Sequence, residues 1–156
     1  MTVRNADPAE LDRLVQLWHD GWQDAHAAIV PPGLKRLRTI ESFRDRLAAA
    51  LPITRVAGPA GAPLGFYYLK GDELNQLYVA AEARGTGVAR VLMADAEARL
   101  RDAGITMAWL ACAIGNDRAA RFYEKSGWRR AGIVVTHAET SEGPFPLEVW
   151  RYEKRL

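Results

Sequence analysis

The chain has 156 residues, a length that suits one domain with a sizeable hydrophobic core. Its 21 lysines and arginines nearly balance its 19 acidic residues, and a net charge of +2 is too small to indicate nucleic acid or an anionic membrane as a partner. The single cysteine, Cys112, excludes an intrachain disulfide, and no apolar stretch reaches membrane-spanning length, so we expect a cytoplasmic protein.

The first third of the sequence predicts one strand and two helices. A strand is expected at residues 2–6, and Asp7-Pro8-Ala9-Glu10 has the residues of a helix start, with Asp as N-cap, Pro first and Glu third. Apolar residues then recur at helical spacing as far as Trp22, before Pro31-Pro32-Gly33 interrupts the pattern. A second helix is expected from about Thr39 to Leu51.

The remaining elements begin with three strands. Residues 53–57, 64–70 and 73–79 are separated by turn residues and predict an antiparallel meander. A glycine-containing loop, a helix over 88–103 and a strand over 105–112 follow, which is the order of a parallel βαβ crossover. A short helix over 117–126 and strands near 128–136 and 145–152 complete the chain. No repeat or linker interrupts it, so residues 1–156 are expected to form a single domain.

The junction between the strand at 73–79 and the next helix is suited to binding a phosphate. Arg84-Gly85-Thr86-Gly87-Val88-Ala89 lies there. A helix start has unpaired N–H groups and a partial positive charge, the glycines allow positive φ, and Arg84 adds a forked set of donors. The spacing excludes a P-loop, which needs a Gly-Lys-Ser/Thr sequence, and a dinucleotide fingerprint, which needs Gly or Ala where Arg90 stands.

Two segments carry a resemblance to a known family. Arg84, Gly87 and Ala89 form an Arg-x-x-Gly-x-Ala pattern that resembles the acyl-coenzyme A (acyl-CoA) pyrophosphate loop of the GNAT superfamily of N-acetyltransferases. Residues 116–128 resemble that superfamily's Asn-x-x-Ala-x-x-Phe-Tyr-x-x-x-Gly-Phe segment, with Trp128 in the last aromatic place. The resemblance implies an α/β (α+β) fold with a mixed sheet of about seven strands and about four helices, in which a splayed parallel pair of strands holds acetyl-CoA. It implies acetyl-CoA as co-substrate and no metal ion.

The resemblance also assigns cofactor-binding residues. A bulge in the fourth strand and the splayed pair free backbone groups, and the pantetheine arm pairs with them like an extra strand. Asn116 is expected to cap the short helix and to contact the pantetheine or hold that helix beside it. The full set comprises Leu77, Tyr78, Val79, Arg84, Gly85, Thr86, Gly87, Val88, Ala89, Asn116, Phe122 and Tyr123.

Acetyl transfer to an amine needs a proton donor for the leaving thiolate and a base for the amine. Tyr123 matches the tyrosine that the family places near the cofactor sulfur, and a phenol can donate that proton. Glu73 is our preferred base, because some members place a glutamate comparably. A bulge would shift the alternation of the strand and make Asp72 or Asn75 the candidate instead. Other members use a glutamate on the fifth strand, where this chain has Ala111.

The acceptor pocket is expected near the first helix. Its sequence has a Trp-x3-Trp-x3-His-x2-Ile-x-Pro pattern similar to that of bacterial small-molecule and amino-acid acetyltransferases, formed by Trp18, Trp22, His26, Ile29 and Pro31. Trp22 and His26 lie one turn apart and are expected, with Asn75, to bind the substrate. His26 is a further candidate for the base or for a hydrogen-bond donor, and a structural role is its alternative. Trp18 is expected in the core. Cys112 lies in an apolar run and is expected to be buried and inert.

The sequence therefore predicts an N-acetyltransferase that transfers an acetyl group from acetyl-CoA to a primary amine by direct attack in a ternary complex. A small molecule or amino acid is the preferred acceptor, and a protein N-terminus or lysine is the alternative, because the chain has no evident acidic stripe for basic peptides. Two other classes remain open: an acyl-CoA sensor without turnover and a nucleotide phosphate binder. Many relatives pair through terminal strands or helices, so a homodimer is one expectation for the assembly.

Overall fold

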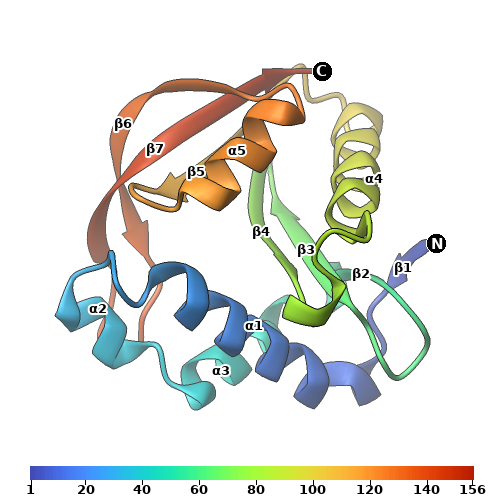
Figure 1. Ribbon diagram of the computed structural model, residues 1–156, viewed down its shortest axis with the longest axis horizontal. Coiled ribbons are helices and arrows are strands. Elements are labelled where there is room, and N and C mark those ends of the chain that lie inside the picture. The colour runs from blue at the N-terminus through green and yellow to red at the C-terminus, as the bar shows by residue number, and fades with distance from the viewer.

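The computed structural model describes all 156 residues and contains one mixed seven-stranded sheet (Figure 1). The strand order is β1-β2-β3-β4-β5-β7-β6, and only β4 and β5 are parallel neighbours. The strands are β1 (Val3–Asn5), β2 (Arg55–Ala57), β3 (Gly65–Lys70), β4 (Glu73–Val79), β5 (Met107–Ala113), β6 (Arg129–Ala138) and β7 (Phe145–Arg155). The predicted meander and the mixed sheet of seven strands are confirmed.

Helices cover both faces of this sheet (Figure 1). They are α1 (Leu11–His26), α2 (Pro32–Leu37), α3 (Ile40–Ala50), α4 (Val88–Asp102) and α5 (Asp117–Lys125). The sequence did not indicate α2, because Pro31-Pro32-Gly33 was interpreted only as an interruption. Proline is favourable in the first turn of a helix, where its missing N–H would have no partner, and Pro32 is the first residue of α2. No helix is both long and apolar enough to cross a bilayer.

Strand β3 separates the two halves of the core. Successive side chains of a strand point to opposite faces, and here Phe66 and Tyr68 pack against Trp18 of α1 while the Tyr67 hydroxyl donates to Asp95 of α4. Trp18 is fully buried, which confirms its predicted place in the core.

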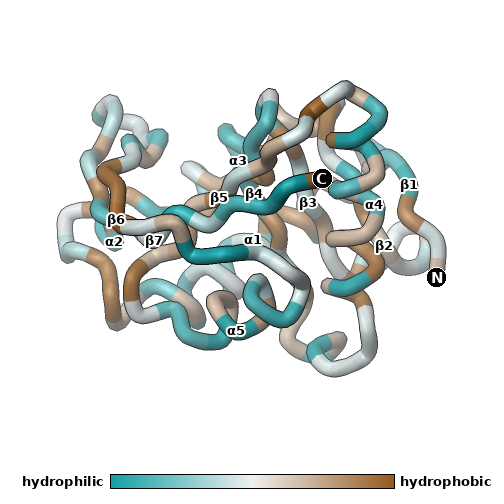
Figure 2. Tube along the Cα trace, turned by 90° about the horizontal axis from the view of Figure 1, so that it is seen from above, coloured by the Kyte–Doolittle hydropathy of each residue, from teal (hydrophilic) through white to brown (hydrophobic).

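The outer strand β6 differs from this core. It carries exposed apolar side chains, and Figure 2 shows the corresponding hydrophobic run along the tube.

The first helix begins with a capping arrangement that fixes the direction of α1. The Asp7 carboxylate accepts from the Ala9 N–H at 2.8 Å, and the Glu10 carboxylate accepts from the Asp7 N–H at 2.9 Å. Arg4 donates to both Glu10 oxygens, at 2.9 and 2.7 Å, and this ion pair lowers the pKa of the buried Glu10 carboxyl to about 2. The predicted start signals are confirmed, although the first turn is a 3-10 helix, Pro8–Glu10, and α1 follows from Leu11.

Candidate active site

The parallel strands β4 and β5 are joined at one end only. Glu73 pairs with Trp109, the Trp109 N–H donates to the Asp72 carbonyl at 3.1 Å, and no other pair of residues connects the two strands. On its other side β5 is paired with β7 along its whole length. Beyond Glu73 the strands therefore diverge and leave a split in the sheet, as the predicted splayed pair requires.

A bulge in β4 decides which of its backbone groups face this split. Tyr68 pairs with Gln76 and Leu69 with Leu74, so Asn75 is the extra residue of the predicted bulge. Above it, the Ala80 N–H donates to the Leu64 carbonyl at 2.8 Å. Because antiparallel pairs alternate, the main-chain groups of Tyr78 then bond to β3, whereas those of Leu77 and Val79 point into the split.

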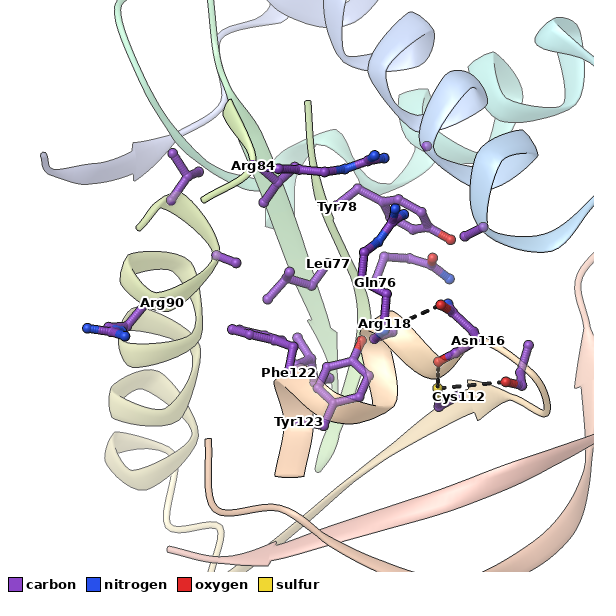
Figure 3. A pocket seen from close by; sticks show the side chains of 18 of the residues that line it. Gln76, Leu77, Tyr78, Arg84, Arg90, Cys112, Asn116, Arg118, Phe122 and Tyr123 are labelled. Carbon is purple, nitrogen blue, oxygen red and sulfur yellow. Dashed lines mark hydrogen bonds between the residues drawn. The ribbon is translucent and has the colours of Figure 1, made fainter. Parts of the chain in front are cut away.

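The split widens into a cleft of about 440 Å³ between β4, β5, α4 and α5 (Figure 3). Leu77, Phe122 and Tyr123 lie together along it, and the Tyr123 hydroxyl points toward its middle (Figure 3). No group of the protein forms a hydrogen bond with that hydroxyl, and burial raises the pKa of Tyr123. The phenol therefore stays protonated near neutral pH and has a proton available for a ligand in the cleft.

The glycine-containing loop lies at one end of the cleft and presents free donors to it. Gly85 and Gly87 have φ values of 79° and 91°, which places both in the left-handed region as expected. Helix α4 begins at Val88, and none of the backbone N–H groups of residues 87–90 has an acceptor in the protein. Thr86 differs from its neighbours. Its N–H and its hydroxyl both donate to the Ala83 carbonyl, and its side chain does not line the cleft.

Charged side chains surround the mouth of the cleft. Arg84 and Arg118 both donate to Oδ2 of Asp24 on α1, at 2.8 and 3.2 Å. Hydrogen bonds lower the pKa of the Asp24 carboxyl, and the bond from Arg84 contributes more than the bond from Arg118. Arg90 lines the cleft as well. Of these residues only Arg84 was predicted for the site, because positions 24, 90 and 118 carry no signal in the pattern that identified the loop.

Helix α5 is capped as predicted, and its cap lies beside the cysteine. The Asn116 side chain accepts from the Ala119 N–H at 3.4 Å, and both Asn116 and Cys112 line the cleft. The Cys112 thiol donates weakly to the carbonyls of Ala113 and Asn116 at 3.8 Å. Burial raises the pKa of this thiol to about 12, so it is protonated at neutral pH. The expected burial of Cys112 is confirmed.

A second cavity, of about 600 Å³, lies beside α1, α2 and the β6–β7 connection. We call it the acceptor cavity. It meets the cleft at the split between β4 and β5, where both are lined by His26, Asn75, Gln76, Tyr78, Ala111 and Ala113. Two ligands, one in each cavity, could therefore touch at this junction.

Trp22 and His26 form one wall of the acceptor cavity. Their rings stack with centroids 5.1 Å apart, and the His26 Nδ1–H donates to the Trp22 carbonyl at 3.2 Å. Burial lowers the pKa of His26 to about 4, so the ring is neutral at pH 7 and its Nε2 can accept a hydrogen bond. These positions fit the pocket wall that the sequence predicts.

The three candidates for the base at the start of β4 occupy different places. Glu73 lines the acceptor cavity, its Oε1 accepts from the Asn75 amide at 3.0 Å, and burial raises its pKa. Asn75 lines both cavities. Asp72, which precedes β4, lines neither cavity. Its carboxylate instead accepts from the Trp109 indole N–H at 3.1 Å. Ala111 leaves β5 without an acidic side chain at the junction.

The family follows from a comparison with known sequences. Residues 15–128 match the sequence model of the family described as Acetyltransferase (GNAT) family. The chain belongs to this family. The resemblance seen in the loop and in α5 is thereby confirmed, and this GNAT protein is an acyltransferase.

Individual relatives agree with this assignment. An uncharacterized N-acetyltransferase of Mycobacterium bovis is 34% identical over 111 residues, which cover 68% of this chain and 69% of that protein. A solved GCN5-related N-acetyltransferase from Rhodopseudomonas palustris superposes with a TM-score of 0.77 at 20% identity, covering 99% of this chain and 95% of that one. An N-acetyltransferase from Thermoplasma acidophilum, solved with coenzyme A, gives 0.69 at 18% identity, covering 99% and 98%. The structures support the GNAT fold.

Proposed function

We propose that this GNAT protein transfers an acetyl group from acetyl-CoA to the primary amine of a small molecule by direct attack in a ternary complex. The observation that carries the proposal is the junction of two cavities at the split. The Tyr123 hydroxyl lies on the side of the cleft and the Glu73 carboxylate on the side of the acceptor cavity. A solved relative holds coenzyme A, which supports the choice of donor.

The cleft has the groups that acetyl-CoA needs. The free N–H groups of residues 87–90, at a helix N-terminus flanked by Arg84 and Arg90, suit a diphosphate. The unpaired main-chain groups of Leu77 and Val79 suit the amides of a pantetheine arm lying beside β4. Bound there, acetyl-CoA would supply an acetyl group activated as a thioester.

The protein's own residues then perform the proton transfers. Tyr123 donates its phenolic proton to the departing thiolate. Glu73, whose raised pKa makes it a stronger base than an exposed glutamate, accepts a proton from the amine directly or through water. Placing the amine and thioester together supplies most of the rate enhancement. Cys112 forms no acetyl intermediate, because its thiol is protonated at neutral pH.

The size of the acceptor cavity supports a small acceptor. Its volume of about 600 Å³ lies within the range that small-molecule sites occupy. Its walls come from α1, α2, α3, the strands β3 to β7 and the β6–β7 connection, and the cavity is partly open to solvent.

Free thiol release from acetyl-CoA in the presence of a panel of amines tests this function. We expect acceptor-dependent release, and we expect Tyr123→Phe to lower kcat at least ~10²-fold while the Kd for coenzyme A stays the same. Tyr152→Phe is the matched control, because Tyr152 lines neither cavity. Binding of coenzyme A with no release for any amine would contradict the enzyme and favour the sensor.

A further inference from the structure

Two arginines of the acceptor cavity have buried donors without acceptors. Arg38, which follows α2, is 5% exposed; its Nη1 donates to the Glu139 carbonyl at 2.6 Å, but its Nε has no partner. Arg46 of α3 forms no hydrogen bond or ion pair within the protein, and both its Nε and its Nη1 are buried. Both side chains line the acceptor cavity.

Such an arrangement is costly in a folded protein. Buried guanidinium groups are almost always paired, because an unpaired charge loses its hydration without compensation. Burial and the neighbouring charge of Arg46 lower the pKa of Arg38 to about 10. Aromatic rings offset part of the cost, since the Arg46 Cζ lies 4.4 Å from the ring centroid of Trp18. The guanidinium lies over the face of this ring, which offers no hydrogen-bond acceptor to the N–H groups in the guanidinium plane.

No acidic side chain of the protein neutralises these two cations by contact. Glu139 lies at the rim and is exposed, with its carboxylate 3.8 Å from the Lys70 ammonium. Glu73 lines the acceptor cavity and accepts a hydrogen bond from the Asn75 amide. Counting histidines as neutral, the charged side chains that line the cavity are three cations, Arg38, Arg46 and Lys70, and two carboxylates, Glu73 and Glu139, so one positive charge is left over.

We propose that the acceptor amine also carries a carboxylate, which Arg38 and Arg46 bind while the amine reaches the junction. This inference rests on the proposed acetyl transfer and names its substrate class: an amino acid or another small amino-carboxylic acid. Guanidinium groups match the planar geometry of a carboxylate. The carboxylate places its negative charge beside Arg38 and Arg46, the two cations of the cavity that have no acidic partner in contact.

Matched acceptors test the carboxylate directly. For each L-amino acid that is acetylated, the carboxamide and the decarboxylated amine are compared, and we expect kcat/KM to fall at least ~10-fold without the carboxylate. Equal kcat/KM for the three forms would overturn the inference and leave the acetyltransferase intact. Higher kcat/KM for phosphoethanolamine or taurine than for every amino acid would also overturn it.

Variants assign the effect to the two arginines. Arg46→Met should remove the preference for the carboxylate form, and Arg38→Met should weaken it, with coenzyme A affinity unchanged. Arg44→Met is the matched control on α3, because Arg44 is exposed and pairs with Asp12 at 2.6 Å outside the cavity. Arg46 is partly exposed, but two of its guanidinium nitrogens are buried without a partner, so the melting temperature of Arg46→Met should be equal to or higher than that of the wild type. Retention of the full carboxylate preference in a folded Arg46→Met variant would contradict the assignment.

Binding without the donor separates this inference from the function on which it rests. Calorimetric titration with amino acids, in the absence of acetyl-CoA, should show saturable binding that is lost in Arg46→Met and kept in Arg44→Met. Such binding without any acetylation would preserve the carboxylate site and refute the proposed function. Absence of both binding and acetylation for every amino acid would overturn the inference itself.

Discussion

We predict that Asp24 competes with coenzyme A for the arginines at the mouth of the cleft. In the structure, one oxygen of Asp24 accepts from both Arg84 and Arg118, at 2.8 and 3.2 Å. A diphosphate bound to the loop would attract these cations, so the ion pairs with Asp24 would weaken when it binds. We therefore expect Asp24→Asn to bind coenzyme A more tightly than the wild type.

The exposure of the three side chains sets the size of this effect. Their side chains are 34% to 54% exposed, and exposed ion pairs contribute ~0.2–1 kcal/mol each. Releasing two such pairs gives ~0.4–2 kcal/mol, or roughly a 2- to 30-fold lower Kd. The gain should shrink as salt rises, because a Debye length of about 10 Å at 0.1 M screens exposed charges.

Calorimetric titration of coenzyme A at low and high salt measures the effect. Asp20→Asn is the matched control, since Asp20 is an exposed residue of α1 that bonds to Gln16 rather than to the arginines. A Kd for Asp24→Asn that equals or exceeds the wild-type value at low salt would refute the reasoning. Asp24 would then hold the arginines in place for the ligand instead of competing for them.

Three further predictions concern stability, each measured by urea unfolding. Gly87→Ala forces a residue with a Cβ to adopt a φ of 91°, so the free energy of unfolding should fall by ~1–2 kcal/mol. An unchanged free energy of unfolding would contradict this. The pKa of His26 is about 4 in the folded protein, so between pH 6.5 and 4 the unfolded chain binds more protons than the folded one. As the pH falls through that window, the free energy of unfolding of the wild type should decrease by up to about 3 kcal/mol relative to His26→Gln. Parallel plots of the free energy of unfolding against pH for the two proteins would disprove this. Glu10→Gln breaks the buried pair with Arg4 and should cost about 3 kcal/mol above pH 4.5, a difference that should vanish as the pH falls toward 2.

Local signals were sufficient for most of the elements. Strand β4 has the predicted bounds, because Gly71-Asp72 turns the chain immediately before it. Helix α2 was missed because one proline can both end one helix and begin the next. The position of β7 between β5 and β6 was not predicted, since strand order depends on packing between distant segments.

The candidate site also contains features that the sequence predicts and features that it does not. The positive φ values of Gly85 and Gly87 and the cap at Asn116 follow from local backbone requirements that the sequence displays. The roles of Tyr123 and Glu73 remain predictions. The sequence could not predict that Arg46 lacks a hydrogen-bond partner. This depends on the tertiary structure, because α3, β3 and the β6–β7 connection surround the guanidinium without providing an acceptor.

The insertion of β7 between β5 and β6 constrains how the chain can fold during its synthesis. The antiparallel strands β1 to β4 come together from the first half of the chain, so they can associate while the ribosome is still translating. Until residues 145–155 emerge, β6 has no neighbouring strand and β5 is joined only to β4, at the single pair Glu73–Trp109. Until then two apolar strand edges stay open, and this nascent stage is when a chaperone would have most to protect.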